Sequence, residues 1–208
     1  MDCSLYLLQK MATEAIATPY TGDPKLDAWH KEIDILVGHP TPYYKFFWMI
    51  AQRFKPRFVV ELGSWRAYGA AHFAGGCPSS QVVTIDIHKD DAWSHQRAID
   101  VAASYDNLTF LHGWTWDMAP TVAAMGKQID VLYIDAWHTY ENVKREWDLY
   151  TPLLASRALI LMDDLFNAPG ACEGMIEFWA EFVKNKYPNF IDAGLHLGIP
   201  FGVLEWTR

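Results

Sequence analysis

Four side chains in the second half of the sequence have the types and spacing for metal or acid–base chemistry. Asp135 ends an apolar run and His138 follows three residues later, while the pair Asp163 and Asp164 ends another apolar run. Carboxylates held close together repel one another unless a cation lies between them, and oxygen ligands of this kind are typical of Mg²⁺ sites. An imidazole beside them is suited to removing a hydroxyl proton at neutral pH. These residues therefore predict a Mg²⁺ site formed by the three carboxylates, with the histidine as general base.

A structural interpretation of the same residues stays open. An aspartate after a strand often caps the following helix, and a second one often accepts backbone N–H groups. A single histidine is also more often structural than catalytic. The position of these residues favours chemistry, because open parallel sheets bind ligands at the carboxyl ends of their strands.

Residues 57–74 have the features of a nucleotide-binding loop. An apolar run ends in an acidic residue, a glycine-containing turn follows, and small apolar residues then begin a helix. Asp86 ends the next apolar run, 23 residues after Gly63 (86 − 63). An acidic side chain about 20 residues beyond such a turn commonly holds ribose hydroxyls, so the pair predicts a nucleoside ligand. The predicted cofactor contacts in these two runs are Glu61, Gly63, Ser64, Gly69, Asp86 and Ile87.

A parallel sheet is needed to bring these residues to one edge. Apolar runs with little polar alternation, separated by helical segments, predict five parallel strands covered by helices on both faces. Two further strands, joined by a short turn around Gly198, predict a C-terminal antiparallel hairpin. The predicted strands are residues 57–62, 82–87, 108–112, 130–135, 158–163, 190–196 and 201–206. From their position after the third strand, Trp114 and Thr115 are expected to border the base of the nucleoside, and Asp135 is expected to contact this ligand as well as the metal.

The two ends of the chain have their own helical segments. Proline-containing breaks at residues 18–24 and 39–42 divide the N-terminal part, because X-Pro pairs disfavour helix. A helix over residues 43–54 and a last helix over residues 173–185 are predicted. We therefore expect residues 1–42 to be a helical extension or lid, a candidate homo-oligomer contact, ahead of a catalytic domain formed by residues 43–208.

Composition excludes several classes of protein. The 208 residues are 51% hydrophobic and 20% charged, which is typical of a globular domain. A net charge of −8 disfavours nucleic acid as a partner, and no apolar run reaches the roughly 20 residues of a membrane span. Three cysteines without CxxC spacing indicate free thiols, and the N-terminus lacks the pattern of a signal peptide. We therefore expect a soluble cytoplasmic protein.

The predicted topology and the Glu61-Leu62-Gly63 turn resemble the class I S-adenosylmethionine-dependent methyltransferases. The segment IDAWHTYENVKREWDLYTPLLASRALILMDDL resembles the Mg²⁺-dependent O-methyltransferases of macrolide sugars and the related cephalosporin hydroxylase-like group. The resemblance implies methyl transfer from S-adenosylmethionine to a hydroxyl of a small sugar-like or phenol-like molecule. It assigns Asp135, Asp163 and Asp164 to the metal and His138 to the base.

Three positions depart from the family pattern. Ala67 stands where a second glycine is common, Gly69 where serine is common, and Trp137 where small or charged residues are common. The altered loop keeps open a second hypothesis, a non-catalytic protein of the same fold that binds S-adenosylmethionine. An NAD-dependent oxidoreductase is disfavoured, because a dinucleotide loop requires a middle glycine that is missing here. Nucleic acid methylation is disfavoured by the acidic charge and by the lack of an Asn-Pro-Pro-Tyr-type motif.

Overall fold

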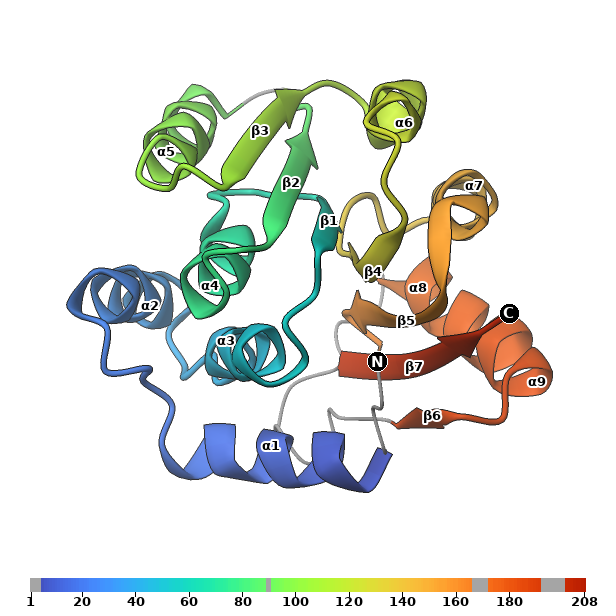
Figure 1. The fold of residues 1–208 in the computed structure, drawn as a ribbon, viewed down its shortest axis with the longest axis horizontal. Helices are drawn as coiled ribbons and strands as arrows, with labels where there is room; N and C mark the ends of the chain where they lie inside the picture. The colour runs from blue at the N-terminus through green and yellow to red at the C-terminus, as the bar shows by residue number, and fades with distance from the viewer. Residues whose placement is uncertain (1–4, 89–90, 166–171, 192–200) are drawn as a thin grey trace.

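The centre of the molecule is a seven-stranded sheet of order β3-β2-β1-β4-β5-β7-β6 (Figure 1). The structure, a computed structural model, describes residues 5–88, 91–165, 172–191 and 201–208. Strands β1 to β5 are parallel, and β7 runs antiparallel to both of its neighbours. The strands are β1 Phe58–Leu62, β2 Gln81–Asp86, β3 Leu108–His112, β4 Ile129–Ile134, β5 Leu154–Asp163, β6 Phe190–Ile191 and β7 Phe201–Thr207. The predicted fold class, a doubly wound and mostly parallel sheet with a C-terminal antiparallel hairpin, is confirmed.

Helices cover both faces of this sheet (Figure 1). The helices α1 to α5 lie on one face, and α6 to α9 lie on the other. The helices are α1 Leu5–Ala17, α2 Pro24–Val37, α3 Tyr43–Phe54, α4 Tyr68–Gly76, α5 Ala92–Ala102, α6 Thr115–Ala124, α7 Tyr140–Tyr150, α8 Glu173–Glu177 and α9 Lys184–Lys186, with a 3-10 turn at Thr151–Leu153 and a π-helix at Phe178–Val183. No helix in these described segments is long and apolar enough to cross a membrane.

Strand β1 shows why the predicted parallel strands lack alternation of apolar and polar residues. Val59 enters the core beneath α3 and α4, and Val60 enters the opposite core beneath α6 and α7. Successive side chains of a strand point to opposite faces, so a strand covered on both faces is apolar throughout. The same alternation directs Glu61 to the face of Val59, beneath α4.

Two segments differ in detail from their predicted bounds. Strand β5 begins at Leu154, four residues before its predicted start, because Leu154 pairs with Ile129 while the exposed Ser156 and Arg157 interrupt the apolar pattern. The predicted last helix is not uniform, since a π-helix separates α8 from α9. The turn around Gly198 and most of the predicted strand 190–196 lie outside the described residues.

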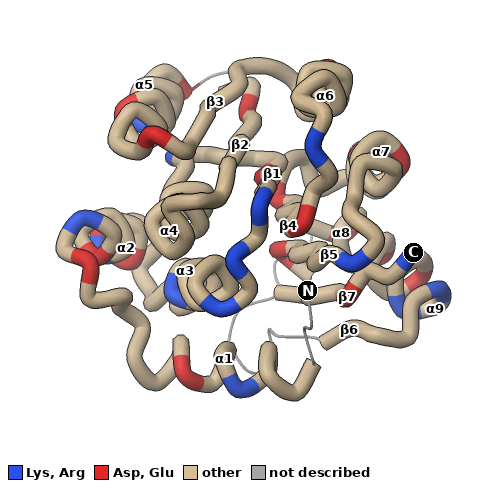
Figure 2. Tube along the Cα trace, in the orientation of Figure 1, with Lys and Arg blue, Asp and Glu red and all other residues tan. Residues whose placement is uncertain are grey.

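Helix α2 carries charges of both signs (Figure 2), and its Glu32 contacts the loop after β1. Glu32 accepts a hydrogen bond from the Tyr68 hydroxyl at 2.7 Å and one from the Arg97 guanidinium. Arg66, in the loop after β1, lies 3.5 Å from the same carboxylate. Residues 1–42 therefore contact the loop between β1 and α4, called the first loop from here on. The division of the chain into an extension or lid (residues 1–42) and a catalytic domain (residues 43–208) stays a prediction.

Acid should destabilise the fold through the buried His72 on α4. Burial lowers the pKa of His72 from 6.5 to about 3. Below pH 6.5 His72 is protonated in the unfolded chain but stays neutral in the folded chain down to about pH 3. The free energy of unfolding therefore falls as the pH drops below 6.5. We expect this histidine alone to cost about 2 kcal/mol between pH 7.5 and pH 5.

Urea unfolding at both pH values measures this effect. The variant His72→Gln should lose about that much of the pH dependence, and His39→Gln, at an exposed position, should keep it. An unchanged pH dependence in His72→Gln would remove His72 as the acid-sensitive group.

Candidate active site

A cavity of about 640 Å³ opens at the carboxyl ends of the parallel strands. Each strand from β1 to β4 contributes its following loop to the wall, as expected for an open parallel sheet. The lining residues include Gly63, Trp65, Asp86, Ile87, His88, Gly113, Trp114, Thr115, Trp116, Asp135, Trp137, His138 and Glu146. Most of the predicted cofactor residues therefore lie around one cavity, whereas Glu61, Ser64 and Gly69 do not line it.

The first loop is held in a conformation that favours glycine. Gly63 has φ +89°, and a Cβ built there would lie 2.0 Å from the carbonyl oxygen of Asp135. Ala67, which replaces the second glycine of the family pattern, is left-handed at φ 60° and directly precedes α4. Its methyl group is buried and does not line the cavity, so the departure adds backbone strain rather than narrowing the site.

Asp86 fixes the first loop through its side chain. Its Oδ2 accepts the backbone N–H groups of Ser64 at 2.9 Å and Trp65 at 2.8 Å. Its Oδ1 accepts the N–H of His88 at 2.8 Å. The carboxylate predicted to bind ribose thus also sets the shape of the loop that faces it.

Replacing this carboxylate by an amide should weaken cofactor binding. Asp86→Asn removes the charge and one acceptor oxygen, and hydrogen bonds to charged groups contribute about 1.5–3 kcal/mol each. The ligand that the resemblance implies is S-adenosylmethionine, and we expect it to bind about 10- to 100-fold more weakly by calorimetry, since each 1.4 kcal/mol is tenfold. The control Asp106→Asn, at an exposed position, should bind normally. Equal affinity in both variants would contradict this role.

Glu61 and Gly69 form a buried contact behind the loop. Glu61 accepts a hydrogen bond from the Thr84 hydroxyl. A Cβ at Gly69 would lie 2.2 Å from Glu61 Oε1, so a larger residue there would displace this carboxylate. Burial raises the pKa of Glu61 well above its usual range. The structure thus places Glu61 beneath α4, away from the cavity.

Aromatic side chains form the wall opposite the first loop. Trp114 stacks on Trp116 with ring centroids 4.8 Å apart, and Trp137 lies 5.3 Å from Trp114. Flat apolar surfaces of this kind suit a purine ring. Trp137 thus lines the cavity beside Trp114, and the contact of this wall with an adenine stays a prediction.

Glu146 on α7 lines the cavity and was missed by the sequence-based prediction. The Thr115 hydroxyl donates to Glu146 Oε1, and the Tyr150 hydroxyl donates to the Thr115 carbonyl at 2.6 Å. Burial raises the pKa of Glu146 to about 7. The sequence pattern could have indicated this residue, because Glu146 is an acidic side chain on the apolar face of α7, together with Val143 and Trp147.

The acidic residues after β4 and β5 lie around the hydroxyl of Tyr133. This hydroxyl is 2.9 Å from Asp135 Oδ2 and 3.0 Å from Asp163 Oδ2. One hydroxyl proton cannot serve both carboxylates at once. Burial, reinforced by the neighbouring carboxylates, raises the pKa of Asp163 well above its usual range, and burial also raises the pKa of Asp135. The pair is therefore poised to hold a proton or a cation.

His138 lies between Asp135 and Asp164. Its Nε2 is 3.6 Å from Asp135 Oδ1, and its Nδ1 is 3.4 Å from Asp164 Oδ2. Burial alone would lower the pKa of His138, but the adjoining carboxylates outweigh it and the pKa is raised. A ring in this setting is a stronger proton acceptor than a free imidazole.

The donor chemistry fits a divalent cation, but the three carboxylates do not share one centre. In the described part of the chain, the side chains that bring three ligand atoms within 4.8 Å of one another are His138, Asp164 and Cys172. Asp135 and Asp163 contact Tyr133 instead. Cys172, just before α8, was not among the predicted site residues. Its contact with His138 depends on how α8 packs against the loop after β4, which the sequence pattern does not encode.

Comparison with known proteins relates the sequence to methyl transfer. Residues 60–165, just over half of the chain, match a family described as a methyltransferase domain. Catechol O-methyltransferase of Sus scrofa is 28% identical over 91 residues, which cover 42% of this chain and 49% of that protein. The match thus spans about half the length of this curated relative.

Solved structures show the same fold over nearly the whole chain. The O-methyltransferase TomG from Streptomyces achromogenes, involved in tomaymycin synthesis and solved with SAM, has a TM-score of 0.71 at 15% identity and covers 98% of each chain. An O-methyltransferase from Bacillus cereus, solved with SAH, has a TM-score of 0.67 at 14% identity and covers 98% of this chain and 99% of that one. At these identities the likeness establishes the fold.

Proposed function

We propose that this chain, which belongs to the methyltransferase domain family, transfers the methyl group of S-adenosylmethionine to a hydroxyl oxygen of a small acceptor. The observation that carries the proposal is the cavity in which the Gly63 loop and Asp86 line the same space as His138. The similarity to catechol O-methyltransferase favours an oxygen acceptor and makes catechol the first probe.

The cofactor would lie between the first loop and the aromatic wall. S-adenosylmethionine supplies an electrophilic methyl group on a positively charged sulfur. Gly63 allows close backbone approach, Asp86 retains acceptor capacity for ribose hydroxyls, and Trp114 offers a flat surface to the adenine. These contacts hold and orient the cofactor, which is where much of the rate acceleration of such a reaction arises.

His138 is the proposed general base. The ring takes the acceptor hydroxyl's proton, and the neighbouring Asp135 and Asp164 carboxylates stabilise the imidazolium that forms. The same carboxylates explain why the pKa of His138 is raised despite its partial burial. Accepting the proton leaves the acceptor oxygen as the nucleophile.

A divalent cation is proposed at the carboxylates of Asp135, Asp163 and Asp164, which would have to move toward one centre as it binds, because Asp135 and Asp163 now contact the Tyr133 hydroxyl. The support is chemical, because hard oxygen donors suit Mg²⁺ and the buried carboxylates oppose one another's ionisation. Mg²⁺ bound there would lower the pKa of the acceptor hydroxyl. Chelator-treated protein should then recover turnover on addition of Mg²⁺, and full turnover in the chelator would remove the cation from the proposal.

Calorimetric titration with S-adenosylmethionine, with and without Mg²⁺ and with NAD as the control, tests the cofactor. Binding of S-adenosylmethionine and none of NAD is expected. Mass spectrometry of catechol incubated with protein and S-adenosylmethionine then tests transfer. Binding without transfer to any hydroxylated acceptor would favour the non-catalytic hypothesis, and no binding would overturn the proposal.

A further inference from the structure

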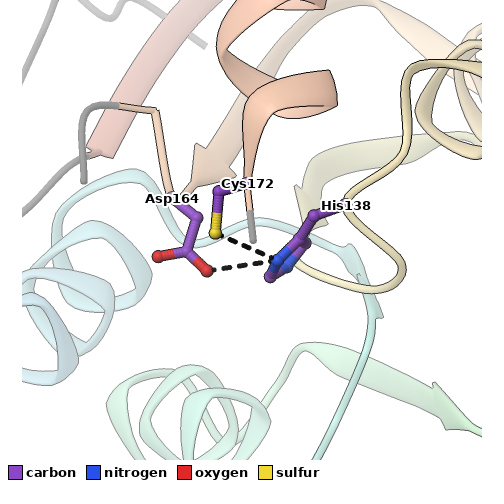
Figure 3. Close-up of side chains that lie close together, drawn as sticks. All are labelled: His138, Asp164 and Cys172. Carbon is purple, nitrogen blue, oxygen red and sulfur yellow. Dashed lines mark hydrogen bonds and ion pairs between the residues drawn. The ribbon is translucent and has the colours of Figure 1, made fainter. Parts of the chain in front are cut away.

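Three side chains from separate segments converge beside the cavity (Figure 3). His138 lies in the loop before α7, Asp164 follows β5, and Cys172 directly precedes α8. Asp164 Oδ2 and Cys172 Sγ each lie 3.4 Å from His138 Nδ1. All three ligand atoms lie within 4.8 Å of one another.

These separations match the spacing of ligands around a small tetrahedral ion. Metal–nitrogen, metal–oxygen and metal–sulfur bonds of about 2.0–2.3 Å at tetrahedral angles place neighbouring ligand atoms about 3.3–3.8 Å apart. The two distances to Nδ1 already fall in this range. The sulfur and the carboxylate oxygen lie within 4.8 Å of each other.

The second nitrogen of the ring is also placed as in a metal site. Asp135 Oδ1 lies 3.6 Å from His138 Nε2, and the Tyr133 hydroxyl holds the same carboxylate at 2.9 Å. A histidine that binds a metal usually directs its other N–H to a carboxylate, which fixes the tautomer and the ring orientation. At 3.6 Å this nitrogen is not yet hydrogen-bonded, and a small rotation of the ring would bring Nε2–H to Asp135 while Nδ1 faces the other two ligands.

The backbone near Cys172 and at Asp164 is compatible with this arrangement of the three side chains. A Cβ at Gly174 would lie 2.1 Å from the backbone nitrogen of Tyr140 and 2.6 Å from the carbonyl oxygen of His138. The start of α8 thus lies directly on the His138 loop, which brings Cys172 to the ring. Asp164 has a left-handed φ of 56°, a conformation in which aspartate is several-fold enriched.

We propose that His138, Asp164 and Cys172 form a binding site for a borderline divalent transition-metal ion of the Zn²⁺ and Co²⁺ class. On binding, the Cys172 thiol releases its proton to solvent, so a thiolate, a carboxylate and a neutral imidazole balance the two positive charges of the ion. Imidazole and thiolate suit such ions and are poor partners for Mg²⁺, which prefers oxygen. Asp164 belongs both to this site and to the proposed Mg²⁺ site.

The consequence for catalysis rests on the function proposed above. A neutral imidazole has one acceptor nitrogen. With Nδ1 on the ion and Nε2–H directed to Asp135, no lone pair is left for the acceptor's proton. Zn²⁺ is therefore expected to inhibit methyl transfer, and Mg²⁺ is not.

Binding is tested without cofactor or acceptor, by titrating the full chain with Co²⁺ under anaerobic conditions after chelator treatment. A thiolate-to-cobalt absorption band in the near ultraviolet should grow to one equivalent, together with the intense visible bands of tetrahedral Co²⁺. Zn²⁺ should abolish both. Cys172→Ser should lose the near-ultraviolet band. The matched control Cys77→Ser should keep it, because this other buried cysteine belongs to no such ligand group within the described segments.

A second variant keeps the test decisive if Cys172→Ser does not fold. Asp135→Asn should retain the thiolate band but weaken Co²⁺ binding about 10- to 100-fold, as expected for loss of a carboxylate that orients a metal-bound histidine. Absence of a thiolate band in the unmodified chain, or its persistence in folded Cys172→Ser, would overturn the site. Because no transfer is measured, failure here leaves the proposed methyltransferase function intact, and failure of the transfer assay leaves this site intact.

Discussion

Replacing His138 with alanine should lower turnover by about 10²- to 10⁴-fold, the usual contribution of a general base. The proton of the acceptor hydroxyl then loses the imidazole whose pKa Asp135 and Asp164 raise, and a carboxylate is a much weaker base than that ring. Affinity for S-adenosylmethionine should stay unchanged, since the first loop and the aromatic wall are untouched. Initial rates with saturating cofactor, beside calorimetry, measure the two effects separately.

The matched control is His39→Ala, which removes an exposed imidazole far along the chain from the site. It should keep full turnover. Normal turnover in His138→Ala would disprove the base assignment, and a parallel loss of cofactor binding would show that the ring acts through the structure of the pocket instead.

Alanine at Gly63 should destabilise the fold by on the order of 2–5 kcal/mol and abolish measurable cofactor binding. A left-handed residue with a Cβ costs about 1–2 kcal/mol, and overpacking costs about 1–3 kcal/mol more. The methyl group would meet the carbonyl oxygen of Asp135 at 2.0 Å. The loops after β1 and β4 must then separate, which opens the floor of the cavity. Urea unfolding and calorimetry measure the two losses.

Gly126→Ala separates the two causes. Gly126 has φ +67°, but a Cβ there meets nothing within 4 Å. This variant should show the strain alone, with normal cofactor binding. Equal losses of stability in both variants would mean that the close approach at Gly63 contributes nothing.

The sheet and the residues of the cavity wall could be predicted from local sequence patterns. Apolar strands separated by helical segments determine a parallel sheet, and such a sheet gathers the residues after its strands at one edge. Gly63, Asp86 and Trp114 line one cavity for this reason. The start of β5 was misplaced because the exposed Ser156 and Arg157 interrupt the apolar pattern within the strand.

Side-chain direction was harder to predict than position along the chain. Glu61 adjoins the glycine loop in sequence, yet strand alternation turns it beneath α4 with Val59. Cys172 contacts His138 because Gly174 lets α8 lie against the backbone of a loop more than 30 residues earlier (174 − 138 = 36). No local periodicity encodes a contact of that kind.

The contact between Glu32 and Arg66 has a consequence for chimeric enzymes. Residues 1–42 precede the segment that matches the family, residues 60–165. Glu32 nevertheless reaches the loop that carries Gly63, where Arg66 also stacks at 3.8 Å on the ring of Trp93. Other N-terminal helices grafted onto this chain would therefore remove a support of the loop that carries Gly63, unless the acidic partner of Arg66 travels with the graft.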